Sequence, residues 1–250
     1  MFSACIARLI SAFSGLKLQA IIYSQIDAKN CMEWGERISN EKYFNKIKSI
    51  HPIYNRLRDE PDFLVGELYF SSIKNLIISF SSTLEFYLKD SIRLNMMRNY
   101  SLLKKGLIES NLSIDPKDIV DCKDIDEIRL KYIKILSEHI CSGELWKNKL
   151  KKYIKLLSLS NNLCTNAVNS RIDSIWKARN DIAHANTSGL SLDYENNTYS
   201  YNSKIGVTEY TQFALLFIKL VDDAIAFLSN VDKLSLDKWE ATDATLLYRI

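Results

Sequence analysis

Residues that interrupt helices are scarce in this chain. Its 250 residues include only 7 glycines and 3 prolines. Glycine and proline are the least favourable residues inside a helix and are common in tight turns. Their scarcity predicts long, uninterrupted helices and argues against a large sheet with many tight turns. Because 47% of the residues are hydrophobic, the chain also has enough apolar surface to bury a core.

Apolar residues recur every three or four positions in several segments, which is the spacing of one face of a helix. Pro61 suits the first turn of the longest segment, a helix of about thirty residues, because a proline there loses no hydrogen bond. Further helices are expected over residues 124–140, 143–157 and 162–185 and in a last long segment. The predicted inward faces are Ile73, Ile77, Phe80, Leu84, Leu88 and Ile92; Ile125, Ile128, Tyr132 and Leu136; Trp146, Leu150, Tyr153, Ile154 and Leu157; and Phe213, Leu216, Phe217, Leu220, Ala224 and Leu228.

The segments between these helices carry signals of their own. The polar character of residues 100–123 predicts a surface linker that holds one short helix. Ser142 is placed to cap the helix over residues 143–157, and Thr208 is placed to cap the last helix. Two runs of alternating residues predict a small β-hairpin insertion near residues 190–202. We therefore predict an all-α bundle of long antiparallel helices with this one insertion.

Two domain divisions fit the pattern. In the first, residues 1–60 form an N-terminal helical extension and residues 61–250 form the main helical domain; in the second, the whole chain is one continuous domain. The apolar start has no basic leader and carries Arg8 and Lys17, so we expect a packed helix and not a signal segment. No membrane crossing is predicted.

Charge and cysteine usage narrow the classes of function. A net charge of +3 is too small to indicate nonspecific nucleic-acid binding by charge alone, so any RNA contact has to be local. The five cysteines are scattered and form no CxxC pair, which predicts neither disulfides nor a zinc site and fits a cytoplasmic protein. His139 and Cys141 have no second pair near them in the sequence, so no metal is expected. No nucleotide-binding loop is present, and no cofactor is expected.

The stretch WKARNDIAHANTSG, residues 176–189, contains the candidate functional residues. Arg179 lies four residues after Ile175 and three before Ile182, so a guanidinium occupies a position on the apolar stripe of a helix. Burying that charge without a partner costs roughly several kcal/mol. Arg179 therefore needs a carboxylate, a partner subunit or a phosphate.

A second line on the same helix consists of Trp176, Asn180 and His184. It places an imidazole and an amide near the guanidinium, an arrangement that suits chemistry on a phosphodiester. A structural interpretation competes, in which Arg179 pairs with Glu85 and His184 only caps helix carbonyls. Spacing alone favours the structural interpretation.

The string Arg179-Asn180-Asp181-Ile182-Ala183-His184 changes this balance. It follows a long helix with SFSSTLEFYLKD and resembles the HEPN superfamily, whose signature is an Arg, often followed directly by Asn, and a His separated from the Arg by four to six residues. The resemblance extends over about residues 64–230 and is strongest to the RiboL-PSP type of bacterial defence and toxin operons. It implies a metal-independent endoribonuclease in which two protomers line one cleft and the RNA 2′-hydroxyl attacks the neighbouring phosphate.

The resemblance also implies roles for individual residues. His184 would be the general acid and base, Arg179 would stabilise the phosphate, and Asn180 would orient or bind it. The implied partners are RNA, a second copy of the chain, and an antitoxin or defence-system protein. Ser188 stands where some members have a tyrosine that an antitoxin modifies, so regulation of that kind is not implied. Because many HEPN proteins are noncatalytic, the alternative is a helical module that binds a protein partner or RNA.

Lysines supply the predicted RNA-contacting surface. Lys147, Lys151 and Lys155 share one face of the helix expected over residues 143–157, and Lys149 and Lys152 lie beside this face. The face could follow a phosphate backbone, although such a face is more often merely solvated. The candidate RNA-contacting residues are Lys147, Lys151, Lys155 and Lys177.

Overall fold

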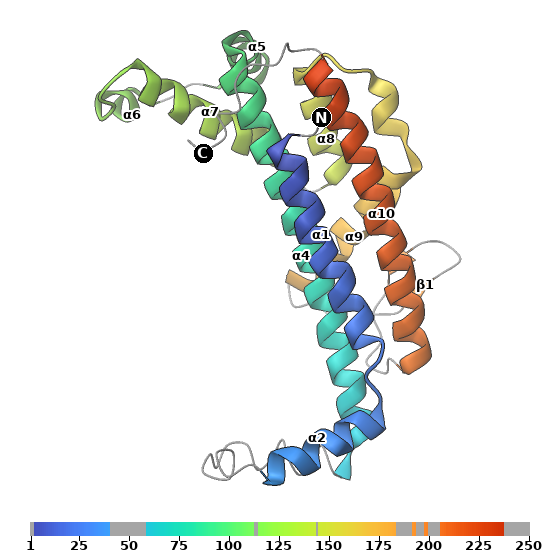
Figure 1. The fold of residues 1–250 in the computed structure, drawn as a ribbon. Helices are drawn as coiled ribbons and strands as arrows, with labels where there is room; N and C mark the ends of the chain where they lie inside the picture. The colour runs from blue at the N-terminus through green and yellow to red at the C-terminus, as the bar shows by residue number, and fades with distance from the viewer. Residues whose placement is uncertain are drawn as a thin grey trace. The chain divides into compact units, whose positions relative to one another are not determined.

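A computed structural model describes residues 3–40, 59–112, 115–143, 145–183, 192–193, 198–199 and 206–237. Within this part of the chain, nearly all residues are helical (Figure 1). The all-α prediction is therefore confirmed. The candidate His184 lies outside the described residues.

The elements follow one another in the order α1 (Ala4–Tyr23), α2 (Ala28–Asn40), α4 (Pro61–Arg98), α5 (Tyr100–Ser110), α6 (Pro116–Val120), α7 (Ile125–Cys141), α8 (Trp146–Leu156), the 3-10 helix η3 (Asn161–Thr165), α9 (Ala167–Ala183), β1 (Leu192–Asp193), β2 (Thr198–Tyr199) and α10 (Val207–Asp237). The two strands pair antiparallel, with Leu192 opposite Tyr199 and Asp193 opposite Thr198. This pair lies inside residues 190–202 and confirms the predicted hairpin.

The longest helix, α4, begins at Pro61 as predicted and extends over 38 residues. All six residues of its predicted inward face are fully buried. The same agreement holds for the five predicted inward residues of α8. For these two helices, which pack along their length, the spacing of apolar residues alone predicted the buried face.

Backbone contacts divide the chain into two compact units, and the division falls within α1, α4, α9 and α10. Unit 1 comprises Met1–Phe13, Ser81–Lys177 and Asp222–Ile250, and unit 2 comprises Ser14–Phe80 and Ala178–Val221. A boundary at residue 60 does not appear in this division. The separate N-terminal extension remains a prediction.

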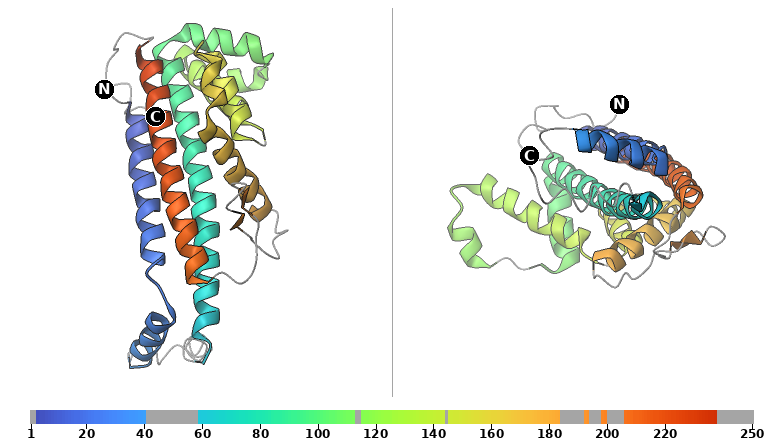
Figure 2. Two further views of the ribbon diagram at one scale, coloured as in Figure 1. Left: turned by 90° about the vertical axis from the view of Figure 1, so that its right-hand side faces the viewer. Right: turned by 90° about the horizontal axis from the view of Figure 1, so that it is seen from below.

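In unit 1, a buried hydrogen-bond network joins α4, α8 and α10. The hydroxyls of Ser91 and Tyr153 lie 2.5 Å apart, and the Asn95 side chain donates to the Ser91 carbonyl at 2.8 Å. Ser235 donates to the Asn95 side-chain oxygen at 2.8 Å. Each polar side chain of this network thus has a partner, as low-polarity surroundings require. The unit 1 stretches of α4 and α10 run side by side (Figure 2).

In unit 2, aromatic residues join the first half of α4 to the first half of α10. The rings of Tyr69 and Tyr210 stack with centroids 4.5 Å apart, and Ser72 hydrogen-bonds the Tyr210 hydroxyl at 2.7 Å. Phe80 meets Phe217 edge to face at 5.7 Å. These contacts use the large apolar area of aromatic rings and still satisfy the Tyr210 hydroxyl.

The segment 100–123 is not the polar surface linker that we expected. It forms α5 and α6, and Leu102, Leu103 and Gly106 of α5 are buried. A Cβ at Gly106 would stand 2.5 Å from Cδ2 of Leu136 on α7. The glycine thus permits a close approach of α5 to α7, and the apolar positions outweigh the polar composition of the segment.

Ser142 ends α7 and does not cap α8. Its backbone N–H donates to the His139 carbonyl at 3.2 Å, and its hydroxyl donates to the same carbonyl at 2.6 Å. Leu145 is the residue before the first turn of α8 and has no side chain that can cap it. The cap that Ser142 was expected to supply comes from another helix, as described below.

Two smaller predictions also need correction. Thr208 lies inside α10, which begins at Val207. Ile125, expected on the inward face of α7, is 60% exposed in the first turn. The buried residues of α7 begin at Ile133, so the helix enters the core only over its second half.

Among the described residues, α1 is the one helix that is long and apolar enough to cross a membrane by length and composition. Cys5, Ile6 and Leu9 of its first half are buried, in keeping with the packed helix that we expected. Leu18 and Ile22 in its second half are exposed. In total, 28% of its most apolar window is buried.

Candidate functional site

Arg179 and Asn180 lie near the C-terminal end of α9, which ends at Ala183. Both side chains are half-buried, whereas Ile172 and Ile175 earlier in the helix are fully buried. His184 directly follows the last residue of α9 in the sequence and lies outside the described residues. The helix therefore carries two of the three predicted site residues at its C-terminal end, where a positive side chain is favoured by the helix dipole.

The Arg179 guanidinium has an amide, and not a carboxylate, as its partner. Its Nη1 donates to Oδ1 of Asn180 at 3.1 Å. None of the ion pairs between described residues includes Arg179, and the proposed partner Glu85 pairs instead with Lys89 at 3.0 Å. The structural interpretation in which Glu85 neutralises Arg179 has no support among the described residues. A neutral amide leaves the positive charge of Arg179 uncompensated.

A second arginine on α9 shows the contrasting arrangement. Nη2 of Arg171 lies 2.8 Å from Oδ2 of Asp223 on α10, and both side chains are about one third exposed. Arg171 is thus a structural arginine with a carboxylate partner. On α9, Arg171 thus forms an ion pair with a carboxylate, whereas Arg179 hydrogen-bonds an amide. The two arginines can be compared directly within one helix.

The pairing of Arg179 with Asn180 suits recognition of an anion. A guanidinium carries five N–H donors, and only one of them is used by the Asn180 oxygen. The amide nitrogen of Asn180 is a further donor. Arginine donors bind phosphate oxygens with short, charge-assisted hydrogen bonds. The described part of the site can therefore bind and stabilise a phosphate, and proton transfer has to come from another group.

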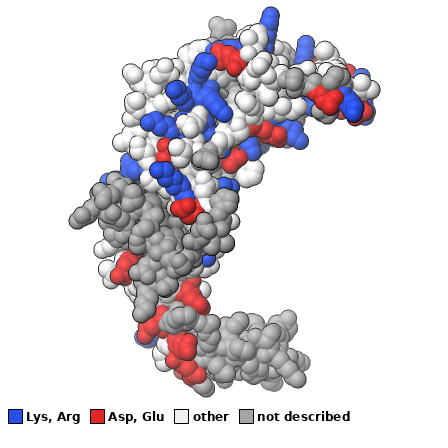
Figure 3. Space-filling view, turned by 180° about the vertical axis from the view of Figure 1, so that it is seen from behind, with Lys and Arg blue, Asp and Glu red and all other residues white. Residues whose placement is uncertain are grey.

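The candidate RNA-contacting lysines are exposed. Lys147 and Lys151 lie on the solvent side of α8, and Lys177 is exposed on α9. Lys155 is also exposed, and its Nζ lies 3.4 Å from Oε2 of Glu109. Basic side chains gather in the upper part of one face of the molecule (Figure 3). The exposure of the four candidate lysines is what contact with RNA would require, and that contact remains a prediction.

Lys149 does not belong to that surface. It is only 5% exposed, donates to the Cys141 carbonyl, and has its Nζ 5.1 Å from the centroid of the Trp176 ring. Trp176 is 2% exposed, and the centroid of its ring lies 6.0 Å from that of Trp146. The sequence contained a signal for the burial of Lys149. This residue follows Trp146 by three positions and precedes Tyr153 by four, so it lies on the same face of the helix as these two residues.

Asp173 has a role that the sequence analysis missed. Its side chain is half-buried, and its Oδ1 accepts a hydrogen bond from the backbone N–H of Lys147 at 2.9 Å. Burial raises the pKa of this carboxyl, and the hydrogen bonds from α8 oppose that rise. Asp173 thus supplies the missing cap at the start of α8.

Metal ligands do not gather in the part of the chain that the structure describes. No group of three His, Cys, Asp or Glu residues comes together there. None of the five cysteines forms a disulfide, and burial raises the pKa of Cys5 to about 11 and that of Cys141 to about 12. At neutral pH these two groups are protonated thiols and not metal-binding thiolates.

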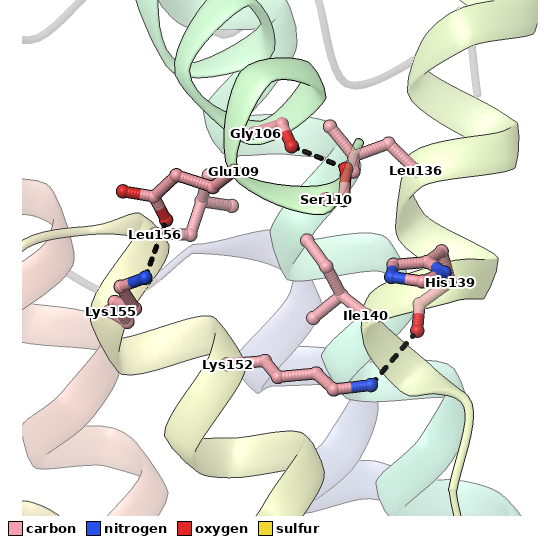
Figure 4. A pocket seen from close by; sticks show the side chains of 9 residues that line it. All are labelled: Gly106, Glu109, Ser110, Leu136, His139, Ile140, Lys152, Lys155 and Leu156. Carbon is pink, nitrogen blue, oxygen red and sulfur yellow. Dashed lines mark hydrogen bonds and ion pairs between the residues drawn. The ribbon is translucent and has the colours of Figure 1, made fainter. Parts of the chain in front are cut away.

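A half-open pocket of about 150 Å³ lies within unit 1 and is lined by residues of α5, α7 and α8 (Figure 4). Its apolar lining comes from Leu136, Ile140 and Leu156, and its polar lining includes His139 and Lys152. The sequence could not reveal it, because its residues come from three separate helices. His139 therefore lines a pocket, a location that its spacing from Cys141 did not indicate.

The comparison with protein families now identifies the class. The RiboL-PSP-HEPN family matches residues 36–226, and the chain belongs to this family. Membership of the HEPN superfamily is thereby confirmed, and a HEPN-type, ribonuclease-related role is supported. The matched range begins inside the segment that we predicted as an N-terminal extension. No curated protein and no solved structure matches the chain.

Proposed function

We propose that this protein is a metal-independent endoribonuclease in which Arg179, Asn180 and His184 act on one RNA phosphodiester. The observation that carries the proposal is the half-buried Arg179, whose guanidinium hydrogen-bonds an amide at 3.1 Å and forms no ion pair with a described carboxylate. An arginine that served stability alone would resemble Arg171, which has Asp223 as its partner. The positive charge of Arg179 is instead available to a phosphate.

The reaction follows from these groups. A base removes the proton of the RNA 2′-hydroxyl, the 2′-oxygen forms a bond to the adjacent phosphorus, and the bond from phosphorus to the 5′-oxygen breaks. The products are a 2′,3′-cyclic phosphate and a 5′-hydroxyl that has received a proton from an acid. His184 serves as base and acid, because imidazole exchanges protons near neutral pH. Arg179 stabilises the added charge on the phosphate oxygens, and Asn180 orients that phosphate.

A homodimer provides the two proton-transfer groups at once. When two copies face each other across a two-fold axis, both motifs line one cleft, and one His184 accepts a proton while the other delivers one. Light scattering is expected to give twice the 28.8 kDa mass of one chain. A monomer at the concentrations at which cleavage is measured would contradict the shared cleft.

The biological role that we propose is that of a toxin or defence effector in the cytoplasm, acting on cellular RNA and held in check by a cognate antitoxin or another defence-system protein. Production of the chain in a bacterial host should slow growth, and production of the His184→Ala variant should not. Equal growth inhibition by the two proteins would show that the effect on the host does not depend on the proposed chemistry.

The proposed reaction is tested by incubating purified protein with single-stranded RNA in the presence of EDTA. We expect fragments that end in 2′,3′-cyclic phosphate, and no such fragments with His184→Ala. Fragments with 3′-hydroxyl ends, or cleavage that EDTA abolishes, would overturn the mechanism. Absence of cleavage by the folded wild-type dimer would favour the alternative, a noncatalytic module that binds a protein partner or RNA.

A further inference from the structure

The pocket between α5, α7 and α8 has no part in the proposed chemistry, and its lining combines an apolar base with a positively charged rim. Leu136, Ile140 and Leu156 are buried side chains that contribute the apolar part. The His139 ring, half-buried on α7, and the ammonium group of Lys152 on α8 lie beside them (Figure 4). Such a combination of apolar walls and a few polar groups is typical of small-molecule sites.

The size of the pocket limits its occupant. The pocket has a volume of about 150 Å³, similar to that of cavities that hold a ligand the size of benzene. A single six-membered ring, such as that of a pyrimidine base, matches this volume, whereas the second ring of a purine would extend out of the pocket. The His139 imidazole offers a flat ring for stacking and a nitrogen for hydrogen bonding, both of which are used to hold unpaired bases.

The charge at the rim favours an anion. Lys152 Nζ donates to the carbonyls of His139 and Ser142, each at 3.4 Å, and no described carboxylate pairs with it. These carbonyls do not neutralise its charge. Lys155 is paired with Glu109, but its side chain is 69% exposed and the pair is therefore weak. A phosphate at the rim would compete with Glu109 for Lys155 and would meet the unpaired charge of Lys152.

The exposed lysines of α8 extend this positive surface away from the pocket. Lys147, Lys151 and Lys155 are four residues apart, which places each about 6 Å along the helix from the next. Successive phosphates of an extended single strand can therefore meet successive lysines, and Lys155 belongs both to this row and to the pocket lining. A bound strand would lead directly to the pocket.

We infer that this pocket binds one unpaired pyrimidine nucleotide of a single-stranded RNA, with the base between the apolar side chains and His139 and the adjoining phosphate on Lys152 and Lys155. The inference rests on the proposed function for the identity of the polymer, because a ribonuclease has RNA as its substrate. It names a substrate subsite that lies outside the Arg179 motif.

The imidazole of His139 allows a direct test on the full-length protein. The chain has three histidines, and the imidazole signal that is lost in His139→Ala assigns the resonance. We expect uridine monophosphate to shift that resonance, with adenosine monophosphate binding at least tenfold more weakly. His139→Ala and Lys152→Gln are each expected to weaken uridine monophosphate binding at least tenfold. Lys104→Ala, which removes an exposed lysine of α5 outside the pocket lining, is the matched control and should bind like the wild type.

The competing explanation is that Lys152 only caps the carbonyls at the end of α7. In that case Lys152→Gln would lower thermal stability and leave nucleotide binding unchanged, which would overturn the inference. An equal response to inorganic phosphate and to uridine monophosphate would overturn it too, because it would show an anion site without base recognition.

Binding of a labelled oligouridine to the His184→Ala protein distinguishes a site for a free nucleotide from a subsite for an RNA strand. If the subsite belongs to the RNA substrate, Lys152→Gln and Lys151→Ala each weaken binding of the oligomer, while Lys151→Ala leaves binding of the mononucleotide unchanged. Oligomer affinity that both substitutions leave unchanged would overturn the RNA subsite. The proposed ribonuclease fails separately, by an absence of cleavage, and nucleotide binding at His139 is measured independently of that result.

Discussion

The Asp173 carboxylate accepts a hydrogen bond from the backbone N–H of Lys147 at 2.9 Å. This contact joins α9, the helix that carries Arg179, to the first turn of α8, the helix that carries the lysine row. Leu145 cannot cap α8 itself, so the start of α8 depends on a side chain that lies 26 residues away along the chain. The placement of the lysine row thus depends on α9.

Replacing Asp173 with alanine should lower the free energy of unfolding by about 1 kcal/mol, because the first turn of α8 loses a hydrogen-bond acceptor. Denaturant unfolding measures the change. Asp181→Ala is the matched control, since Asp181 is an exposed residue of the same helix and forms no ion pair with any described residue. Equal effects of the two substitutions would show that the cap contributes nothing specific.

The pKa of Asp173 predicts how stability depends on pH. Burial raises this pKa above the ordinary value of 3.8, so the folded state binds the proton more tightly than the unfolded state does. The stabilisation from this proton is fully present below pH 3.8 and is lost as pH rises through the raised pKa of the folded state. Relative to Asp173→Asn, which caps without titrating, the wild type should lose stability over that window. A relative gain in stability with rising pH would contradict the raised pKa.

The predictable parts of the fold are those that depend on local spacing. Pro61 begins α4 as expected, and the inward residues of α4 and α8 are buried. These residues could be predicted because a helix that packs along its whole length has apolar residues repeated every three or four positions. The Arg179 motif was found for the same reason: its residues lie within six consecutive positions.

The unpredicted parts join residues from different helices. The Asp173 cap and the pocket around His139 depend on how α5, α7, α8 and α9 pack, which local spacing does not determine. Lys149 was misplaced for another reason. The spacing of Lys149 placed it on the inward face, but its charge suggested an exposed position. In the structure, the Cys141 carbonyl at the end of α7 and the Trp176 ring stabilise this charge in the core.

Two glycines in helices predict opposite effects of the same substitution. Gly106→Ala would place a Cβ 2.5 Å from Cδ2 of the fully buried Leu136, and overpacking of this kind costs about 1–3 kcal/mol, more than the helix propensity that alanine gains. Gly15 in α1 has nothing within 4 Å of such a Cβ, so Gly15→Ala should raise the free energy of unfolding by about 0.5–1 kcal/mol.

Thermal unfolding of the two variants checks this pair. Gly106→Ala should melt below the wild type and Gly15→Ala above it. A gain in stability from Gly106→Ala would mean that α5 does not approach α7 as closely as the structure shows.

The central claim is that Arg179 acts on a phosphate whereas Arg171, on the same helix, acts on Asp223. The most direct test compares RNA cleavage by Arg179→Ala and Arg171→Ala at a temperature where both variants are folded. We predict that Arg179→Ala lowers the cleavage rate about 10²–10³-fold, as expected for loss of a donor to a developing charge, and leaves stability nearly unchanged. Arg171→Ala should lower the free energy of unfolding by up to about 1 kcal/mol and leave cleavage within a few-fold of the wild type. Equal cleavage rates for the two variants would contradict the assignment of Arg179 to the reaction.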